Sequence, residues 1–207
     1  MIHPHRRISA LFFLHIAQRR YSDKMLEKGR VNLRPQIRLV AFVVLGFTFG
    51  VLSVAAAGKQ AVAVIYPASG STCKGIVRIT QDADSVKIVA DLEGLAPNTK
   101  HGFHVHEYGD CSAADATSAG THYDPAATKH HGMPNEKTSH AGDMGNIEAD
   151  ANGKAHYELT LQGASIDGLQ APVLGRAVII HANPDDFGQP VGNAGGRIGC
   201  GVIGLAK

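Results

Sequence analysis

The 207-residue sequence contains no tryptophan, only three cysteines, and no cluster of basic side chains beyond residue 57. Its 24 glycines, and short apolar runs broken by Gly, Pro, Asn and Asp, favour an all-β domain over a helical one. Residues 1–57 carry nine basic and two acidic side chains, whereas residues 58–207 carry 11 basic and 16 acidic ones. A segment with a net charge of −5 and no basic stripe argues against nucleic-acid binding.

Residues 1–57 have the pattern of a leader rather than of a folded domain. A basic flank precedes 19 uncharged, mostly apolar residues, Leu39–Ala57, which end in three alanines. This pattern predicts a secretory signal peptide, although the run is also long enough for an uncleaved membrane anchor. Met25 is an alternative start, because the residues before it add nothing that a signal needs. We therefore expect residues 58–207 to be exported, periplasmic or extracellular, and to contact a membrane only through a retained leader.

Seven short runs beyond the leader are predicted as β-strands, because they are apolar or β-branched and are bounded by turn-forming residues. They span residues 60–67, 75–80, 85–92, 101–108, 155–161, 176–182 and 199–206. Seven or eight short strands in about 150 residues predict a β-sandwich or barrel. Two polar, Gly-rich stretches, 110–146 and 183–197, are expected to be long functional loops.

Seven of the 12 histidines lie between residues 101 and 140, which suggests a metal site. His104 and His106 are two positions apart in a predicted strand, so both imidazoles project from one face. Two imidazoles on a rigid strand form half of a site for copper, nickel or zinc. A solvated His-rich loop would explain the histidines of the first long loop. It would not explain His181, which ends an apolar strand.

Six segments occur in the order and spacing of a known enzyme family. They are GFHVHEYGDC, SAGTHYDP, HHGMP, HAGDMGN, IIHANPDD and GNAGGRIGCGVIGLAK. Through them residues 60–206 resemble the copper–zinc superoxide dismutases, and the short segment around Cys111 resembles the bacterial secreted branch. The resemblance implies a Greek-key β-sandwich, or flattened barrel, of about eight antiparallel strands with two long functional loops. It also implies an enzyme that converts superoxide to dioxygen and hydrogen peroxide with copper and zinc.

The resemblance assigns a role to each candidate ligand. The implied copper ligands are His104, His106, His122 and His181. The implied zinc ligands are His122, shared by both metals, together with His140, Asp143 and either His130 or His131. The HGMP segment favours His131, whereas the spacing from His122 also allows His130.

Four further residues match family positions around the metals. Asp185 matches a carboxylate that links a copper histidine to a zinc histidine, and Arg197 matches the arginine beside the copper channel. Cys111 and Cys200 match a disulfide, which leaves Cys73 as a thiol near a strand start. An alternative function is a non-catalytic copper-binding or copper-delivery module of the same fold, but such a module should lack a ligand or the channel arginine. The oligomeric state stays open, with a homodimer as one alternative.

Overall fold

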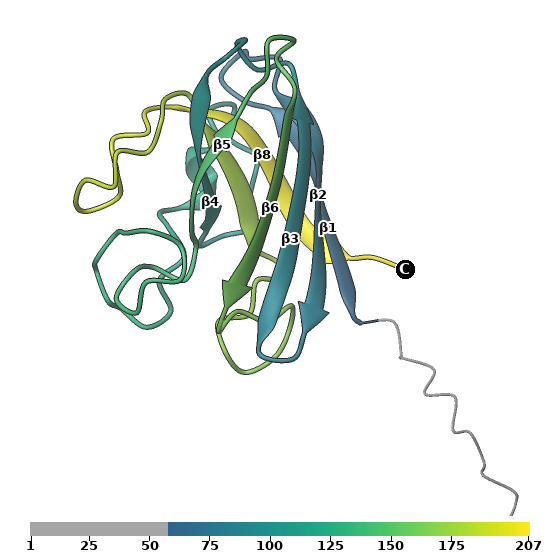
Figure 1. Ribbon diagram of the computed structural model, residues 1–207, viewed down its shortest axis with the longest axis vertical. Coiled ribbons are helices and arrows are strands. Elements are labelled where there is room, and N and C mark those ends of the chain that lie inside the picture. Colours follow the sequence, from purple (N-terminus) through teal and green to yellow (C-terminus); the bar gives the residue numbers. More distant parts are fainter. Residues whose placement is uncertain (1–57) are drawn as a thin grey trace, which may run out of the picture. The chain divides into compact units, whose positions relative to one another are not determined.

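The computed structural model describes residues 58–207, and Figure 1 shows their arrangement. Within that range, none of the helical segments is long and apolar enough to cross a lipid bilayer. The predicted leader, with its alternatives of a cleaved signal and a retained anchor, lies outside the described residues.

Eight β-strands form the domain, and every pairing between them is antiparallel. They are β1 (Gln60–Pro67), β2 (Lys74–Asp82), β3 (Ser85–Glu93), β4 (Lys100–His106), β5 (Asp143–Glu148), β6 (Ala155–Gln162), β7 (Ala177–His181) and β8 (Arg197–Leu205). They pair in the order β5-β4-β7-β8-β1-β2-β3-β6. β5 and β6, the two ends of this order, lie side by side, so the sheet curls into a nearly closed barrel (Figure 1). The β3–β4 and β6–β7 connections join strands that are not neighbours, which confirms the predicted Greek-key pattern.

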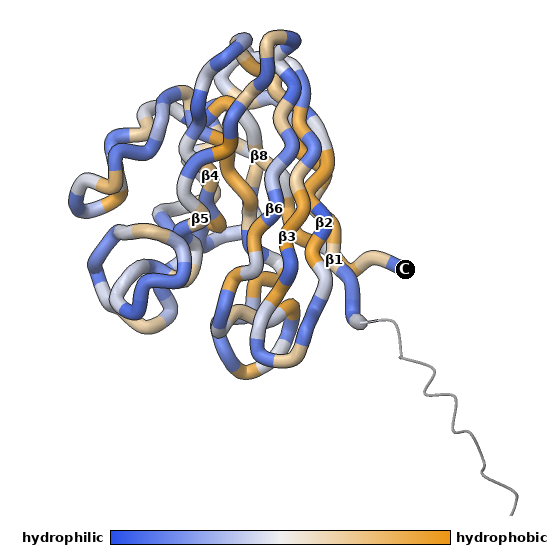
Figure 2. Tube along the Cα trace, viewed as in Figure 1, coloured by the Kyte–Doolittle hydropathy of each residue, from blue (hydrophilic) through white to orange (hydrophobic). Residues whose placement is uncertain are grey.

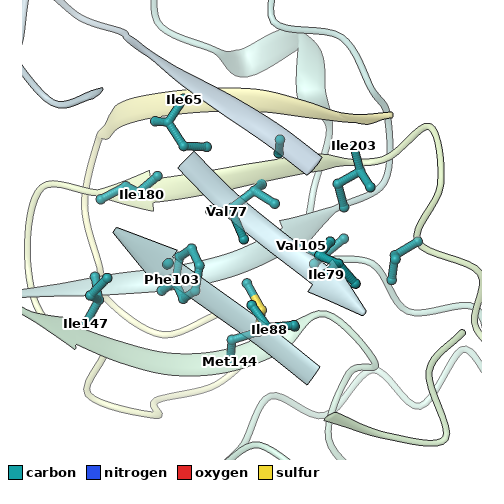
Figure 3. Packing of buried hydrophobic residues seen from close by; sticks show 14 of the residues in the cluster. Ile65, Val77, Ile79, Ile88, Phe103, Val105, Met144, Ile147, Ile180 and Ile203 are labelled. Carbon is teal, nitrogen blue, oxygen red and sulfur yellow. The ribbon is translucent and has the colours of Figure 1, made fainter. Parts of the chain in front are cut away.

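Alternation along the strands decides which side chains fill the barrel. In β3, Val86, Ile88, Ala90 and Leu92 are buried, whereas Lys87 and its alternate neighbours face outward. Figure 2 shows hydrophobic residues concentrated along the strands and hydrophilic ones in the long loops. Figure 3 shows the buried isoleucines, valines and Phe103 packing together inside the barrel. Full burial of one such side chain stabilises the fold by about 1.5–3 kcal/mol.

Strand β7 is buried on both of its faces. Val178 and Ile180 belong to the barrel core, whereas Ala177 and Ile179 face outward. These two residues form a second apolar cluster outside the barrel, with Ala68, Ala116, Ala119 and Cys200. Since Ala116 and Ala119 come from the long loop after β4, this loop covers the outer face of β7.

A disulfide ties this loop to the barrel. Cys111 is bonded to Cys200 of β8, as the resemblance implied, with 5.8 Å between the two Cα atoms. The bond closes a chain segment of 89 residues, which corresponds to about 4–5 kcal/mol of stability on the chain-entropy model. Cys73 is free and buried, and burial raises the pKa of its thiol to about 12. Cys73 is therefore an unreactive thiol of the core at neutral pH.

The sequence predicts a loop over residues 110–146, but strand β5 begins at Asp143. Met144 and Ile147 pack into the barrel core, and Gly145 between them has a φ of 76°, which interrupts the alternation. Asp143 is also buried, on the opposite side of the strand. Four of its six residues are buried and only Glu148 is exposed, so β5 lacks the regular apolar–polar alternation by which a half-buried strand is recognised.

Candidate metal centre

The histidines gather on the outer face of the wall formed by β4 and β7. In β4, Phe103 and Val105 enter the barrel core, so the alternate residues His104 and His106 face outward. β4 pairs with β7, which ends at His181. The barrel core and the histidines therefore occupy opposite faces of the same strands.

Backbone pairing places three further site residues opposite the histidines of β4 and β7. Three pairs are formed across neighbouring segments: His122 opposite His106, Asp143 opposite His104, and Arg197 opposite His181. The first two depend on a close approach at Gly142, whose carbonyl accepts the Val105 N–H at 2.9 Å. A Cβ atom at position 142 would lie 2.2 Å from the Val105 carbonyl oxygen. Only glycine permits this approach.

The first group of imidazoles consists of His104, His106, His122 and His181, all buried. One nitrogen from each ring lies within 4.8 Å of the others. His106 Nδ1 donates to the Gly120 carbonyl at 3.0 Å, and His181 Nδ1 donates to the Gly195 carbonyl at 3.2 Å. Because a carbonyl oxygen only accepts, these Nδ1 atoms carry the protons and the Nε2 atoms carry the lone pairs.

The second group consists of His122, His131, His140 and Asp143. Asp143 Oδ1 lies 2.9 Å from His122 Nδ1, 3.0 Å from His131 Nδ1 and 3.3 Å from His140 Nδ1. Bond lengths of about 2.0–2.1 Å in a tetrahedral zinc site place neighbouring ligand atoms about 3.3 Å apart. Asp143 Oδ2 accepts the backbone N–H groups of Gly132 and His140, both at 3.1 Å, which fixes the carboxylate.

Asp185 connects the two groups. Its carboxylate accepts from His104 Nε2 at 2.8 Å and from His131 Nε2 at 2.8 and 2.9 Å. Each of these rings therefore turns its Nδ1 toward its own group. Burial alone would raise the pKa of Asp185, but the hydrogen bonds from His104 and His131 hold it well below its usual range. Asp185 is thus an anion that orients two imidazoles.

Burial also controls the protonation of the histidines. It lowers the pKa of His104 and His106, and it lowers the pKa of His122 to about 4 and of His181 to about 3. All four rings of the first group are therefore neutral at pH 7 and have a lone pair to donate. His131 differs: burial alone would lower its pKa, but the adjacent carboxylates of Asp143 and Asp185 outweigh burial and raise its pKa to about 9. A metal at the second group must displace that proton.

The donor atoms fit one copper and one zinc. Among residues 58–207, five buried imidazole nitrogens make no well-aligned hydrogen bond: Nδ1 of His104, His131 and His140, and Nε2 of His106 and His181. Those of His131 and His140 lie near Asp143 Oδ1, at 3.0 and 3.3 Å, as fellow ligands of one metal would. Each unpaired buried polar atom costs about 1–3 kcal/mol. All five belong to members of the two groups, where a metal ion would satisfy them. Four imidazoles suit copper, and three imidazoles with one carboxylate suit a tetrahedral zinc.

Comparison with known proteins agrees with this chemistry. The family model described as copper/zinc superoxide dismutase matches residues 73–203. The chain is 48% identical over 141 residues to the Cu-Zn superoxide dismutase of Paramecium bursaria Chlorella virus 1, covering 65% of this chain and 74% of that relative. It is 37% identical over 156 residues to the extracellular Cu-Zn superoxide dismutase of Brugia pahangi, covering 70% and 76%. The crystal structure of the clock protein EA4 matches with a TM-score of 0.65 at 37% identity, covering 73% of this chain and 97% of that one.

The chain belongs to the copper/zinc superoxide dismutase family. It is accordingly an oxidoreductase that takes two superoxide anions and two protons to dioxygen and hydrogen peroxide, with copper and zinc as cofactors. The family, the fold and the activity implied by the sequence motifs are confirmed. The narrower placement in the bacterial secreted branch stays a prediction.

A cavity of about 160 Å³ opens onto the first group of this superoxide dismutase. Its lining includes His106, His122, His181, Thr121, Gly195 and Arg197. The half-buried Arg197 donates to the carbonyl oxygens of Ala116 and Gly120, each at 2.5 Å. Both acceptors belong to the loop after β4 that the Cys111–Cys200 disulfide ties down. The guanidinium is therefore fixed beside the imidazoles of the first group.

The structure brings nine of the candidate site residues into one centre: His104, His106, His122, His131, His140, Asp143, His181, Asp185 and Arg197. The two alternatives for the last zinc histidine lie in different environments. His131 is fully buried within the second group, whereas His130 is exposed and belongs to neither group.

Two further polar residues shape the centre without having been predicted. His101 donates from Nδ1 to the His181 carbonyl at 2.8 Å, and its Nε2 lies 2.7 Å from Thr99 Oγ1. His101 lies three residues before His104, and side chains alternate along a strand. The sequence therefore indicates that the two histidines point to opposite faces of β4. Asn146 pairs its side-chain amide with the N–H and C=O of Asp185 at 2.7 and 2.9 Å. No local pattern reveals this contact, because the partners are 39 residues apart.

The two neighbouring histidines allow a matched test of the second group. We expect His131→Ala to weaken zinc binding by more than about 100-fold, beyond the 10- to 100-fold typical of residues that only orient a ligand. We expect His130→Ala to retain zinc like the wild type, because its side chain is exposed. Zinc per chain, and zinc affinity by chelator competition, measure both. Equal retention in the two variants would contradict the placement of His131.

Proposed function

We propose that the first group is the copper site and the second group the zinc site of this superoxide dismutase. Copper would be held by Nδ1 of His104 and by Nε2 of His106, His122 and His181. Zinc would be held by Nδ1 of His122, His131 and His140 and by Asp143 Oδ1. The observation that carries this assignment is the set of buried, unpaired nitrogens. In His104, His106, His131 and His181, the opposite ring nitrogen is already hydrogen-bonded to a carbonyl or to Asp185.

Copper bound there supplies the one-electron redox chemistry that dismutation requires, whereas zinc is redox-inert and supplies fixed charge. The remaining steps fall to the protein. His122 belongs to both groups and lines the cavity, with its Nδ1 held 2.9 Å from Asp143. Its Nε2 would therefore hold a proton only when it does not bind copper, and would pass that proton to the departing product. Asp143 fixes this ring so that Nε2 faces the cavity.

Arg197 has the position to attract and orient the substrate. Superoxide is an anion, and residues 58–207 carry a net charge of −5, so the domain as a whole repels it. A fixed guanidinium at the cavity opposes this repulsion locally, and a cleft lined by one sign of charge can raise association rates by about 10- to 1,000-fold. A copper-delivery module would not need a guanidinium anchored by two carbonyls at the cavity. We therefore do not favour that alternative.

Metal content measured together with turnover tests the assignment. We expect the purified protein, loaded with both metals, to hold about one copper and one zinc per chain and to remove superoxide rapidly. Removing copper alone should abolish turnover, whereas removing zinc should leave copper bound. Copper bound without turnover would contradict the catalytic assignment and favour copper delivery.

We expect Arg197→Ala to lower kcat/KM by about tenfold and to flatten its dependence on ionic strength, while copper stays bound. Superoxide decay measured at several salt concentrations provides both quantities. Arg78→Ala is the charge-matched control, because Arg78 is exposed on β2 and pairs with Asp91. If Arg197→Ala and Arg78→Ala behave alike, Arg197 does not guide the substrate.

Export of the domain is also part of the proposal. It is supported by the Cys111–Cys200 disulfide, since such bonds persist in oxidising compartments, and by the extracellular designation of the Brugia pahangi relative. A periplasmic or extracellular location follows, with the leader either cleaved or retained. Fractionation of the source cells tests it, and recovery of the protein from the cytosol would contradict it.

A homodimer is the assembly that the surface favours. Exposed Val64 of β1 and exposed Val202 of β8 lie on paired strands and alternate with core residues, so both project from the outer face of the barrel. Val202 also lies beside Gly109, which follows the exposed Tyr108. These exposed apolar side chains are the surface that a second copy would cover.

We expect the wild type to be a dimer and the Val202→Glu variant to be more monomeric, because the substitution would bury a charge in the interface. Light scattering over a range of concentrations measures this. Leu169→Glu is the control, because Leu169 is fully exposed on the β6–β7 connection and lies outside this surface. A wild-type protein that is monomeric at micromolar concentration would contradict the dimer.

A further inference from the structure

The main chain of His131 is held by a side chain of the second long loop. Gln189 accepts the His131 N–H at its Oε1 at 3.0 Å, and its Nε2 donates to the His131 carbonyl at 2.7 Å. One carboxamide therefore satisfies both backbone groups of this residue, as a neighbouring strand would. His131 needs such a partner because no strand lies between residues 107 and 142.

The same loop encloses the imidazole of His131. Asp185 accepts from Nε2, and the ring of Phe187 stacks on the imidazole with 6.2 Å between centroids and 16° between planes. Gly192 closes the remaining side, since a Cβ there would lie 3.1 Å from His131 Nε2 and 2.3 Å from Asp185 Oδ1. Gln189 is the member of this enclosure that fixes the backbone from which the ring projects.

We propose that Gln189 is a positioning residue for zinc: it fixes the main chain of His131 so that Nδ1 stays aimed at the second group. This inference rests on the proposed role of His131 as a zinc ligand. His104 and His106 have no such dependence, because they stand on β4, whose backbone pairs with β5 and β7. Loss of the Gln189 carboxamide should therefore loosen zinc and spare copper.

Two variants separate the hydrogen bonds from simple packing. Gln189→Ala removes the whole side chain, whereas Gln189→Met keeps its length and volume without the amide. We expect both to weaken zinc binding and to speed its release by about 10- to 100-fold, the usual effect of losing a residue that orients a ligand. We also expect the visible absorption bands of cobalt(II) bound in place of zinc to change, because they report the geometry of the ligands.

Gln81→Ala is the matched control. Gln81 also pairs its carboxamide with main chain, donating to Ala83 and Ser85 and accepting from Ile166, away from the metal groups. We expect it to lower the Tm of the metal-free protein and to leave zinc release and the cobalt spectrum unchanged.

The readouts are zinc release into a chelator, the cobalt(II) spectrum and copper per chain, measured on the whole protein. Faster zinc release with a changed cobalt spectrum in both Gln189 variants, and neither in Gln81→Ala, supports the inference. Unchanged release and spectrum in the Gln189 variants overturn it, and so does equal acceleration in Gln81→Ala. The zinc content of the wild type distinguishes the two possible failures. A wild type that binds no zinc would contradict the proposed function, whereas a wild type that binds zinc and Gln189 variants that release it at the same rate would contradict this inference alone.

Discussion

In His104, His106, His131 and His181 one ring nitrogen is hydrogen-bonded to a fixed acceptor, and the metal centre depends on this interaction. An imidazole in the protein interior offers a lone pair in a chosen direction only if its other nitrogen has a fixed partner. Asp185 is that partner for His104 and His131, and loop carbonyls serve His106 and His181. Because these partners come from loops, the loops must be as rigid as the strands. Much of the structure outside the barrel serves this requirement.

The Gly120 carbonyl shows how tightly the requirements are connected. It accepts from His106 Nδ1 and also from the guanidinium of Arg197. One backbone atom therefore fixes both an imidazole of the first group and the guanidinium that lines the cavity. The loop that carries it is held by the disulfide at Cys111 and by the outer apolar cluster on β7. Reduction of the disulfide would thus loosen the substrate channel as well as lower stability.

Sequence reasoning predicts those parts of the centre that follow from local geometry. Alternation alone places His104 and His106 on one face of a strand, and apolar runs bounded by turn residues locate seven of the eight strands. The other site residues lie on separate segments, so only the family resemblance joins them before the structure is known. Spacing leaves His130 and His131 open, because adjacent residues in an irregular loop differ by no periodicity. Burial separates them.

The parts that escape prediction depend on contacts between distant segments. β5 is hidden because its polar residue Asp143 is buried against the second group rather than exposed. The carboxamides of Asn146 and Gln189 replace backbone pairing for Asp185 and His131, across 39 and 58 residues of sequence. Nothing in the neighbouring sequence distinguishes these amides from solvated ones, because their partners become neighbours only when the chain folds.

Placing the core and the metal centre on opposite faces of the same strands makes the core part of the catalytic machinery. Phe103, between His104 and the core, meets Tyr157 of β6 edge-on with 5.4 Å between ring centroids. The Tyr157 hydroxyl donates to the carbonyl of Met144, the residue after Asp143. This chain of contacts links β6 to both β4 and β5. A cavity made by shortening Phe103 would therefore shift His104 of the first group and the Asp143 carboxylate of the second group together, although both lie on the opposite face of their strands. The centre is rigid because the strands that carry it are packed on their other face.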